Sequence, residues 1–186
     1  MTTPYQVSGR LTAPVNDSDH VLGPDTAPVT LVEYGDYECP FCGAAHPVVQ
    51  DLLRLREGTV RYVYRHFPLS NVHPHAELAA ETAEAAGARG RFWAMHDWLF
   101  THQDELSLGG LLRAAEELGL PAAEVDREIR GHMYLDRIRR DFISGVRSGV
   151  NGTPTFFVNG TRHDGGHSLA ELTMAVDEAA ALVRPG

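Results

Sequence analysis

The 186-residue chain contains two cysteines, and both lie in the motif Cys39-Pro40-Phe41-Cys42. Two thiols at this spacing can close a small disulfide ring or open to a dithiol. A disulfide across so short a loop removes little entropy from the unfolded chain and therefore adds little stability. The motif is better suited to reversible redox chemistry than to structural cross-linking.

The motif also predicts which thiol reacts first. Proline is favoured in the first turn of a helix, so Pro40 predicts a helix that begins directly after Cys39. The free backbone N–H groups and the positive end of the helix dipole at that position stabilise a thiolate. We therefore expect the pKa of Cys39 to lie below the ordinary value of about 8.5, which makes Cys39 the attacking thiol. Cys42 lies one turn further into the helix and is the resolving thiol.

A zinc half-site is the structural alternative for this cysteine pair. Such a site needs two further ligands, which His66, His73 and His75 could supply. The chain has no second Cys-x-x-Cys motif. We therefore expect no metal and no organic cofactor, because the two sulfurs themselves hold the electrons that are exchanged.

The segments around the motif predict a strand, a helix and a second strand. Residues 28–34 form a β-branched and aromatic run that is typical of a strand buried on both faces. Residues 39–56 place apolar side chains at helical spacing, and residues 59–66 alternate like a strand. Two such strands joined by a helix imply a right-handed crossover.

The rest of the chain is helical until strands return near its end. Helices are predicted over residues 76–86, 91–101, 108–118, 121–130 and 133–147. They are followed by a strand over 155–158, a turn at Asn159-Gly160, a returning strand over 161–163 and a helix over 169–183. The predicted order is a β-α-β half, a helical insertion and a β-β-α half.

Three features of this chain resemble the thioredoxin superfamily, and in particular its DsbA-like branch. They are the segment Asp36–Cys42, the segment Gly152–Phe156 and Pro47, which follows Cys42 by five residues. The resemblance implies an α/β thioredoxin fold, a central mixed sheet flanked by helices, with an inserted all-helical domain. It places the thioredoxin-like domain at residues 20–70 and 151–186 and the insertion at 71–150, after an extended N-terminal arm over 1–19.

The resemblance also assigns roles to residues outside the motif. It implies a cis peptide bond before Pro154, which would turn the Thr153 backbone toward Cys39, where it can pair with an extended substrate. It implies that Glu33 is a buried acid that accepts the proton of Cys42, since burial raises the pKa of a carboxyl group. The residues alone leave two alternatives open: a trans proline at a strand start, and a glutamate whose carboxylate reaches solvent at a sheet edge.

Phe41 differs from the pattern of strongly oxidising DsbA-like proteins, which commonly have histidine directly before the second cysteine. We assign Phe41 to the substrate-binding surface with Thr153 and Pro154. Without an imidazolium at that position, and with Asp36 and Glu38 nearby, the Cys39 thiolate gains less stabilisation. A potential between about −200 and −270 mV is expected, the values of glutaredoxins and thioredoxin. His46, one turn after Cys42, is expected to be an ordinary exposed helix histidine.

Composition narrows the possible partners. The net charge of −9 disfavours a surface that binds nucleic acid. All 16 cationic side chains are arginines, so the chain has no lysine for Schiff-base chemistry or for a P-loop. No apolar run has the length of a membrane span, so no membrane association is expected. Residues 1–19 lack the features of a secretory signal, which predicts a cytoplasmic protein, although a chain whose signal had been removed would start in the same way.

The predicted function is that of a thiol–disulfide oxidoreductase that uses Cys39 and Cys42, more suited to reduction or isomerisation than to strong oxidation. Its partners would be protein or low-molecular-weight thiols and disulfides, with an unidentified electron donor or acceptor. Two alternatives remain at this point. One is an enzyme like the kappa-type glutathione transferases and isomerases, in which Cys42 would be superfluous. The other is a binding or chaperone module whose dithiol senses redox state.

Overall fold

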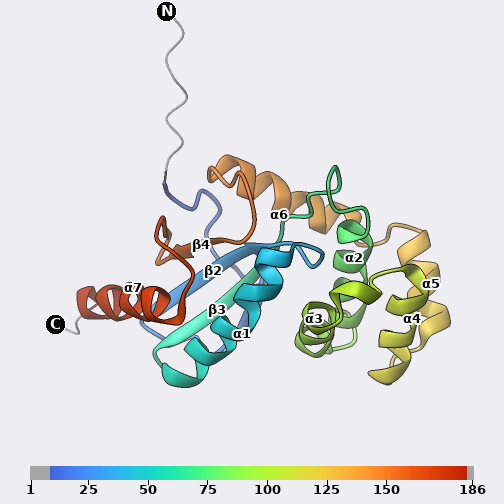
Figure 1. Cartoon of the computed structure of the whole chain (residues 1–186), viewed down its shortest axis with the longest axis horizontal. Helices are drawn as coiled ribbons and strands as arrows, with labels where there is room; N and C mark the ends of the chain where they lie inside the picture. Colours follow the sequence, from blue (N-terminus) through green and yellow to red (C-terminus); the bar gives the residue numbers. More distant parts are fainter. Residues whose placement is uncertain (1–8, 184–186) are drawn as a thin grey trace, which may run out of the picture.

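The computed structural model describes residues 9–183, and its centre is a five-stranded mixed sheet (Figure 1). The strand order is β1-β3-β2-β4-β5. β2 and β3 are parallel, whereas β1 with β3, β2 with β4 and β4 with β5 are antiparallel. The strands are β1 (His20–Leu22), β2 (Val29–Gly35), β3 (Val60–His66), β4 (Thr155–Val158) and β5 (Thr161–Arg162).

Helix α1 (Pro40–Leu55) connects the two parallel strands, as the crossover predicts. Between β3 and β4 the chain is helical, and α2 to α5 form a group beside the sheet from which α6 runs back toward it (Figure 1). The helices after α1 are α2 (Ala76–Gly87), α3 (Phe92–Thr101), α4 (Leu108–Glu117), α5 (Ala122–Arg130), α6 (Leu135–Arg147) and α7 (Leu169–Leu182). The thioredoxin fold with a helical insertion is thus confirmed.

The N-terminal segment is the part that the sequence described least well. The short strand β1 was not predicted. Of the expected arm over residues 1–19, residues 1–8 lie outside the described part of the chain. The remainder lies against the fold, because Leu11 donates its N–H to the carbonyl oxygen of Gly160 at 2.8 Å and Thr12 donates to the Ser148 hydroxyl at 3.0 Å.

The central strands β2, β3 and β4 are buried on both faces, as predicted for β2. Successive side chains of a strand point to opposite faces. Leu31 therefore joins a larger core, with residues of α1 and of the helical insertion, whereas Val32 and Tyr34 join a smaller core with Phe67 and Phe157. Glu33 interrupts this apolar strand on the same face as Leu31. Within the described residues, we find no helix with the length and apolarity of a membrane span.

Candidate active site

Cys39 is the N-cap residue of α1, and Pro40 is the first residue of the helix, as the motif predicts. The Cys39 side chain is 3% exposed and lies 3.4 Å from the carbonyl oxygen of Thr153. The hydrogen bond from the Cys42 thiol is the main cause that lowers the pKa of Cys39 to about 5. The Thr153 side chain and hydrogen bonds from the backbone N–H groups of Cys42 and Phe41 act in the same direction, against the opposing effect of burial. Cys39 is therefore a thiolate at neutral pH.

Cys42 has the opposite electrostatic character. It is fully buried, and both cysteines are free thiols in this structure. Burial raises the pKa of Cys42 well above its ordinary value, and the hydrogen bond to Cys39 and the charge of Glu33 add to this effect. The structure therefore pairs one reactive thiolate with one protonated thiol that needs a base before it can react.

Glu33 lies in the central strand β2 and is 2% exposed, so its carboxylate does not reach solvent at a sheet edge. Burial raises the pKa of Glu33 to about 7, although the hydrogen bond from Tyr62 opposes this and the charge of Cys39 adds to it. The Tyr62 hydroxyl donates to Oε2 of Glu33 at 2.6 Å. A carboxyl group with this pKa takes up and releases protons near neutral pH. When it is ionised, its charge raises the pKa of Cys42.

The peptide bond between Thr153 and Pro154 is cis, as the family resemblance implied. This loop lies against Cys39 although the two are 114 positions apart in the sequence. Thr153 and Pro154 also line a pocket of about 290 Å³ together with Arg162 and His167.

Asp36 and Glu38, the two acidic residues that precede Cys39, form hydrogen bonds with the loop between β3 and α2. Oδ2 of Asp36 accepts a hydrogen bond from the Leu69 N–H at 2.8 Å and lies 2.8 Å from Nδ1 of His73. Burial acts to lower the pKa of His73, but the hydrogen bond and charge of Asp36 outweigh it, and the charge of Cys39 adds to the rise. Glu38 is bound in the same way by the N–H and ring of His75. Each of these carboxylates therefore contacts a histidine of this loop, which the sequence did not indicate.

The helical insertion contacts the start of α1 through Gln103, which sequence reasoning missed. Its side-chain amide donates to the carbonyl oxygens of Tyr37 and Cys39 at 2.8 and 2.9 Å. Gly43 allows this approach, because a Cβ atom at position 43 would lie 2.2 Å from the Gln103 side-chain oxygen. No local pattern marks Gln103, since its role depends on which face of the insertion meets α1.

The expectation for His46 was wrong, because its side chain is 7% exposed and packs against α3. The three histidines considered for a zinc site with the cysteines contact carboxylates instead. His66 lies 2.8 Å from Glu84, while His73 and His75 are held as described above.

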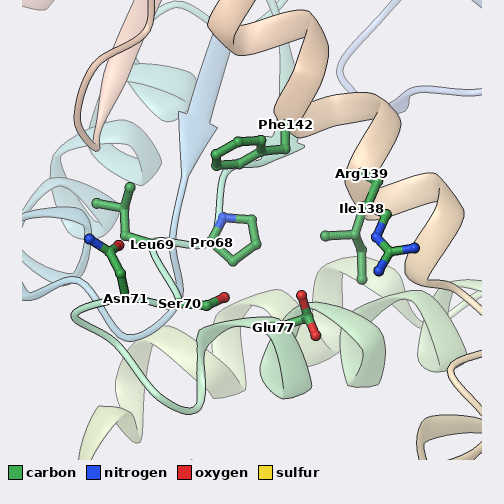
Figure 2. Close-up of a pocket in the computed structure, with 8 residues that line it drawn as sticks. All are labelled: Pro68, Leu69, Ser70, Asn71, Glu77, Ile138, Arg139 and Phe142. Atoms are coloured by element: carbon green, nitrogen blue, oxygen red, sulfur yellow. The ribbon is translucent and has the colours of Figure 1, made fainter.

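A separate pocket of about 300 Å³ lies between the β3–α2 loop, α2 and α6 (Figure 2). Figure 2 shows Leu69 in the loop, Glu77 in α2 and Phe142 in α6 around this space. Phe41, Thr153 and Pro154 are not among its lining residues, so this pocket is distinct from the predicted substrate contacts.

The combination of fold and paired cysteines agrees with the comparison to protein families. The Thioredoxin_4 family model, described as thioredoxin, matches residues 15–178. The chain belongs to this family. It carries the Cys39–Cys42 pair at the start of α1 within the thioredoxin fold.

Solved structures support the fold. A thioredoxin-like oxidoreductase from Silicibacter pomeroyi DSS-3 is 32% identical with a TM-score of 0.80, covering 89% of this chain and 94% of that one. BdbD from Bacillus subtilis is 21% identical with a TM-score of 0.80, covering 93% of this chain and 94% of that one. Wolbachia pipientis alpha-DsbA1 is 23% identical with a TM-score of 0.81, covering 95% of this chain and 97% of that one. At these lower identities the last two likenesses concern the fold alone.

The curated relatives are longer proteins. The Na⁺/H⁺ antiporter NhaA 3 of Salinispora tropica is 50% identical over 175 residues, which cover 94% of this chain and 27% of the antiporter. NhaA 1 of Mycobacterium sp. (strain KMS) is 41% identical over 180 residues, which cover 95% of this chain and 29% of the antiporter. The chain thus spans less than a third of the length of these relatives.

Proposed function

We propose that this protein transfers electrons from its dithiol to substrate disulfides, or isomerises them, and does not act as a strong oxidant. The Cys39 thiolate attacks a substrate disulfide, forms a mixed disulfide and expels one substrate thiolate. Cys42 then gives its proton to Glu33 and attacks the sulfur of Cys39. This step closes the Cys39–Cys42 disulfide and releases the second substrate thiolate, so two electrons pass from the dithiol to the substrate.

The observation that carries this proposal is the asymmetry of the two thiols. Cys39 has a pKa of about 5, whereas burial keeps Cys42 protonated next to Glu33, whose pKa is about 7. A permanently ionised Cys42 would compete with Cys39 for the substrate disulfide, and a Cys42 without a base would leave the mixed disulfide trapped. The arrangement favours capture first and release second.

The pKa of Cys39 also bears on the direction of transfer. Stabilising the thiolate stabilises the reduced form, and thioredoxin has a thiol pKa of about 7 with a potential of about −270 mV. At pH 7 the lower pKa of Cys39 favours the reduced form by about 50-fold over that reference, or about 50 mV for a two-electron couple. The proposed potential is therefore about −220 mV, well below the value of about −120 mV of DsbA.

Such a couple suits a reducing compartment. A cytosolic glutathione pool lies at about −220 to −260 mV by biochemical extraction, so a couple at about −220 mV would range there from about half dithiol to more than about 90% dithiol. We propose the cytoplasm as the site of action on this ground. The substrate would lie across the Thr153–Pro154 loop and against Phe41, whose side chain is 73% exposed.

Equilibration of the protein with a series of reduced and oxidised glutathione mixtures tests the direction. The fraction of Cys39–Cys42 disulfide is read by alkylation and mass spectrometry, and a midpoint near −220 mV is expected. A midpoint near −120 mV would overturn the reductive assignment.

The Cys42→Ser variant tests the exchange scheme itself. Without the resolving thiol, mixed disulfides between Cys39 and a peptide or protein disulfide substrate should accumulate. Failure to trap any partner would contradict the scheme. Full turnover without Cys42 would instead support the transferase-like alternative, in which a single thiol suffices.

A further inference from the structure

A cluster of two histidines and one aspartate lies between α1 and α3, apart from the two cysteines. His46, His96 and Asp97 each offer one ligand atom, and these atoms lie within 4.8 Å of one another. His46 follows Cys42 by about one turn of α1, whereas His96 and Asp97 are consecutive residues of α3. The cluster therefore forms only when the insertion packs against the active-site helix.

His46 has a buried nitrogen that the described residues do not satisfy. Its Nε2 atom lacks a hydrogen-bond partner, although it lies 3.3 Å from Oδ1 of Asp97. The side chain of His46 is 7% exposed. A buried polar atom without a hydrogen-bond partner is unfavourable, so an additional partner at this position would stabilise the fold.

The neighbouring side chains hold the three groups in place. The His46 ring stacks on Phe100, with 5.0 Å between ring centroids, and meets the edge of His96 at 5.3 Å. Nδ1 of His96 lies 3.1 Å from the Tyr37 hydroxyl. Metal-binding histidines usually have their second nitrogen bound to such a partner, which fixes the ring orientation.

Asp97 is oriented as well, since the Gln50 side-chain amide donates to its Oδ1 at 3.3 Å. The Asp97 side chain is 55% exposed. The carboxylate of Asp97 is therefore open to solvent, so an ion can reach it without opening the core.

We infer that His46, His96 and Asp97 bind one divalent transition-metal ion, with water in the remaining position. Imidazole nitrogen and carboxylate oxygen are typical ligands of Zn²⁺ and its neighbours in the first transition row. Ligands at zinc bond lengths in a tetrahedral site are about 3.4 Å apart, which agrees with the 3.3 Å between His46 and Asp97.

Metal titration of the protein in its Cys39–Cys42 disulfide form tests the site, because oxidation removes the thiols as competing ligands. Co²⁺ is followed by its visible absorption, and Zn²⁺ by competition with a chromogenic chelator. One equivalent of each ion should bind to the wild type. His46→Ala and Asp97→Asn should each weaken Zn²⁺ binding by about 100-fold or more, given that loss of mere supporting residues already weakens sites by about 10–100-fold.

A matched control distinguishes this site from a second cluster of Glu77, Glu81 and His132. His132→Ala should leave the binding unchanged. Because the Asp97 side chain is exposed, Asp97→Asn tests the site even if His46→Ala disturbs the core, and circular dichroism checks that each variant is folded. The proposal is overturned if the wild type binds no stoichiometric ion, if folded Asp97→Asn binds as tightly as the wild type, or if His132→Ala alone abolishes binding.

Discussion

Replacing Glu33 by glutamine should separate the two halves of the exchange reaction. Glutamine keeps the shape of the side chain and an oxygen that can accept the hydrogen bond from Tyr62, but it cannot accept a proton. Capture of a substrate disulfide by Cys39 should change little, because Cys39 is already a thiolate at neutral pH. Release by Cys42 should slow by about 100-fold or more, since a positioned general base contributes about 10²- to 10⁴-fold.

The pH dependence of release gives a second readout of the same group. In the wild type the release rate should rise with pH around a midpoint of about 7, the pKa of Glu33. This midpoint should be absent in Glu33→Gln. Tyr62→Phe removes a hydrogen bond that lowers the pKa of Glu33, so it should move the midpoint to higher pH. Tyr134→Phe is the matched control, because the Tyr134 hydroxyl donates to Glu128 instead.

The same carboxyl group makes stability depend on pH. Because the pKa of Glu33 rises from 4.5 to about 7 on folding, the folded state holds the proton over a pH range in which the unfolded chain has lost it. The contribution of Glu33 to stability therefore falls as pH rises from about 4.5 to above 7, by about 3 kcal/mol in total. Glu33→Gln should be more stable than the wild type by about this amount at pH 8, and by much less at pH 5.

Single-turnover quenched-flow experiments measure the kinetic effects. A peptide disulfide is mixed with the reduced protein, the reaction is stopped with acid, and mixed and intramolecular disulfides are quantified by mass spectrometry. Urea denaturation of the reduced protein at pH 5 and pH 8 measures the stability effect. Release by Glu33→Gln at the wild-type rate, or an equal stability difference at both pH values, would refute the assignment of Glu33 as a buried base.

Three further predictions concern other parts of the site. Phe41→His should raise the reduction potential in the glutathione equilibrium by placing an imidazole beside Cys39, while the urea midpoint stays nearly unchanged because position 41 is exposed. Gly43→Ala and Gln103→Ala should each destabilise the protein by about 1–3 kcal/mol. Because both substitutions disrupt the same hydrogen bonds, their effects should not add in the double variant. Additive free energies of unfolding, measured by urea denaturation, would contradict this. Glu84→Gln should cost about 3–5 kcal/mol at pH 7 in the same assay. Although burial opposes it, hydrogen bonds from two histidines hold the Glu84 pKa below its ordinary value, so the wild type should lose stability on acidification and the variant should lose less.

Much of the fold follows from local patterns along the chain. The β-branched run of β2, the apolar spacing of α1 and the turn at Asn159-Gly160 each act over a few neighbouring residues. The reactivity of Cys39 belongs to the same class, because a cysteine before a helix-starting proline lies at the positive end of the helix dipole wherever that helix packs. These features are readable from the sequence because their physics is local.

The three-residue strand β1 has too few residues for a periodic signal, and it exists because β3 offers a free edge for pairing. His46 was expected to be exposed because the spacing of α1 does not say that α3 covers that face of the helix. Tyr62 and Gln103 likewise reach the site from other elements. Each of these features depends on a contact between distant segments.

The sequence alone therefore determined the reactive pair, the order of helices and strands from β2 onward and the family. The tertiary structure decided the environment of those groups. It buries Glu33, places the Tyr62 hydroxyl within hydrogen-bond distance of it and brings His46 into the core. The physical reason is that burial and long-range hydrogen bonds set pKa values, and both arise only when segments far apart in the chain pack together.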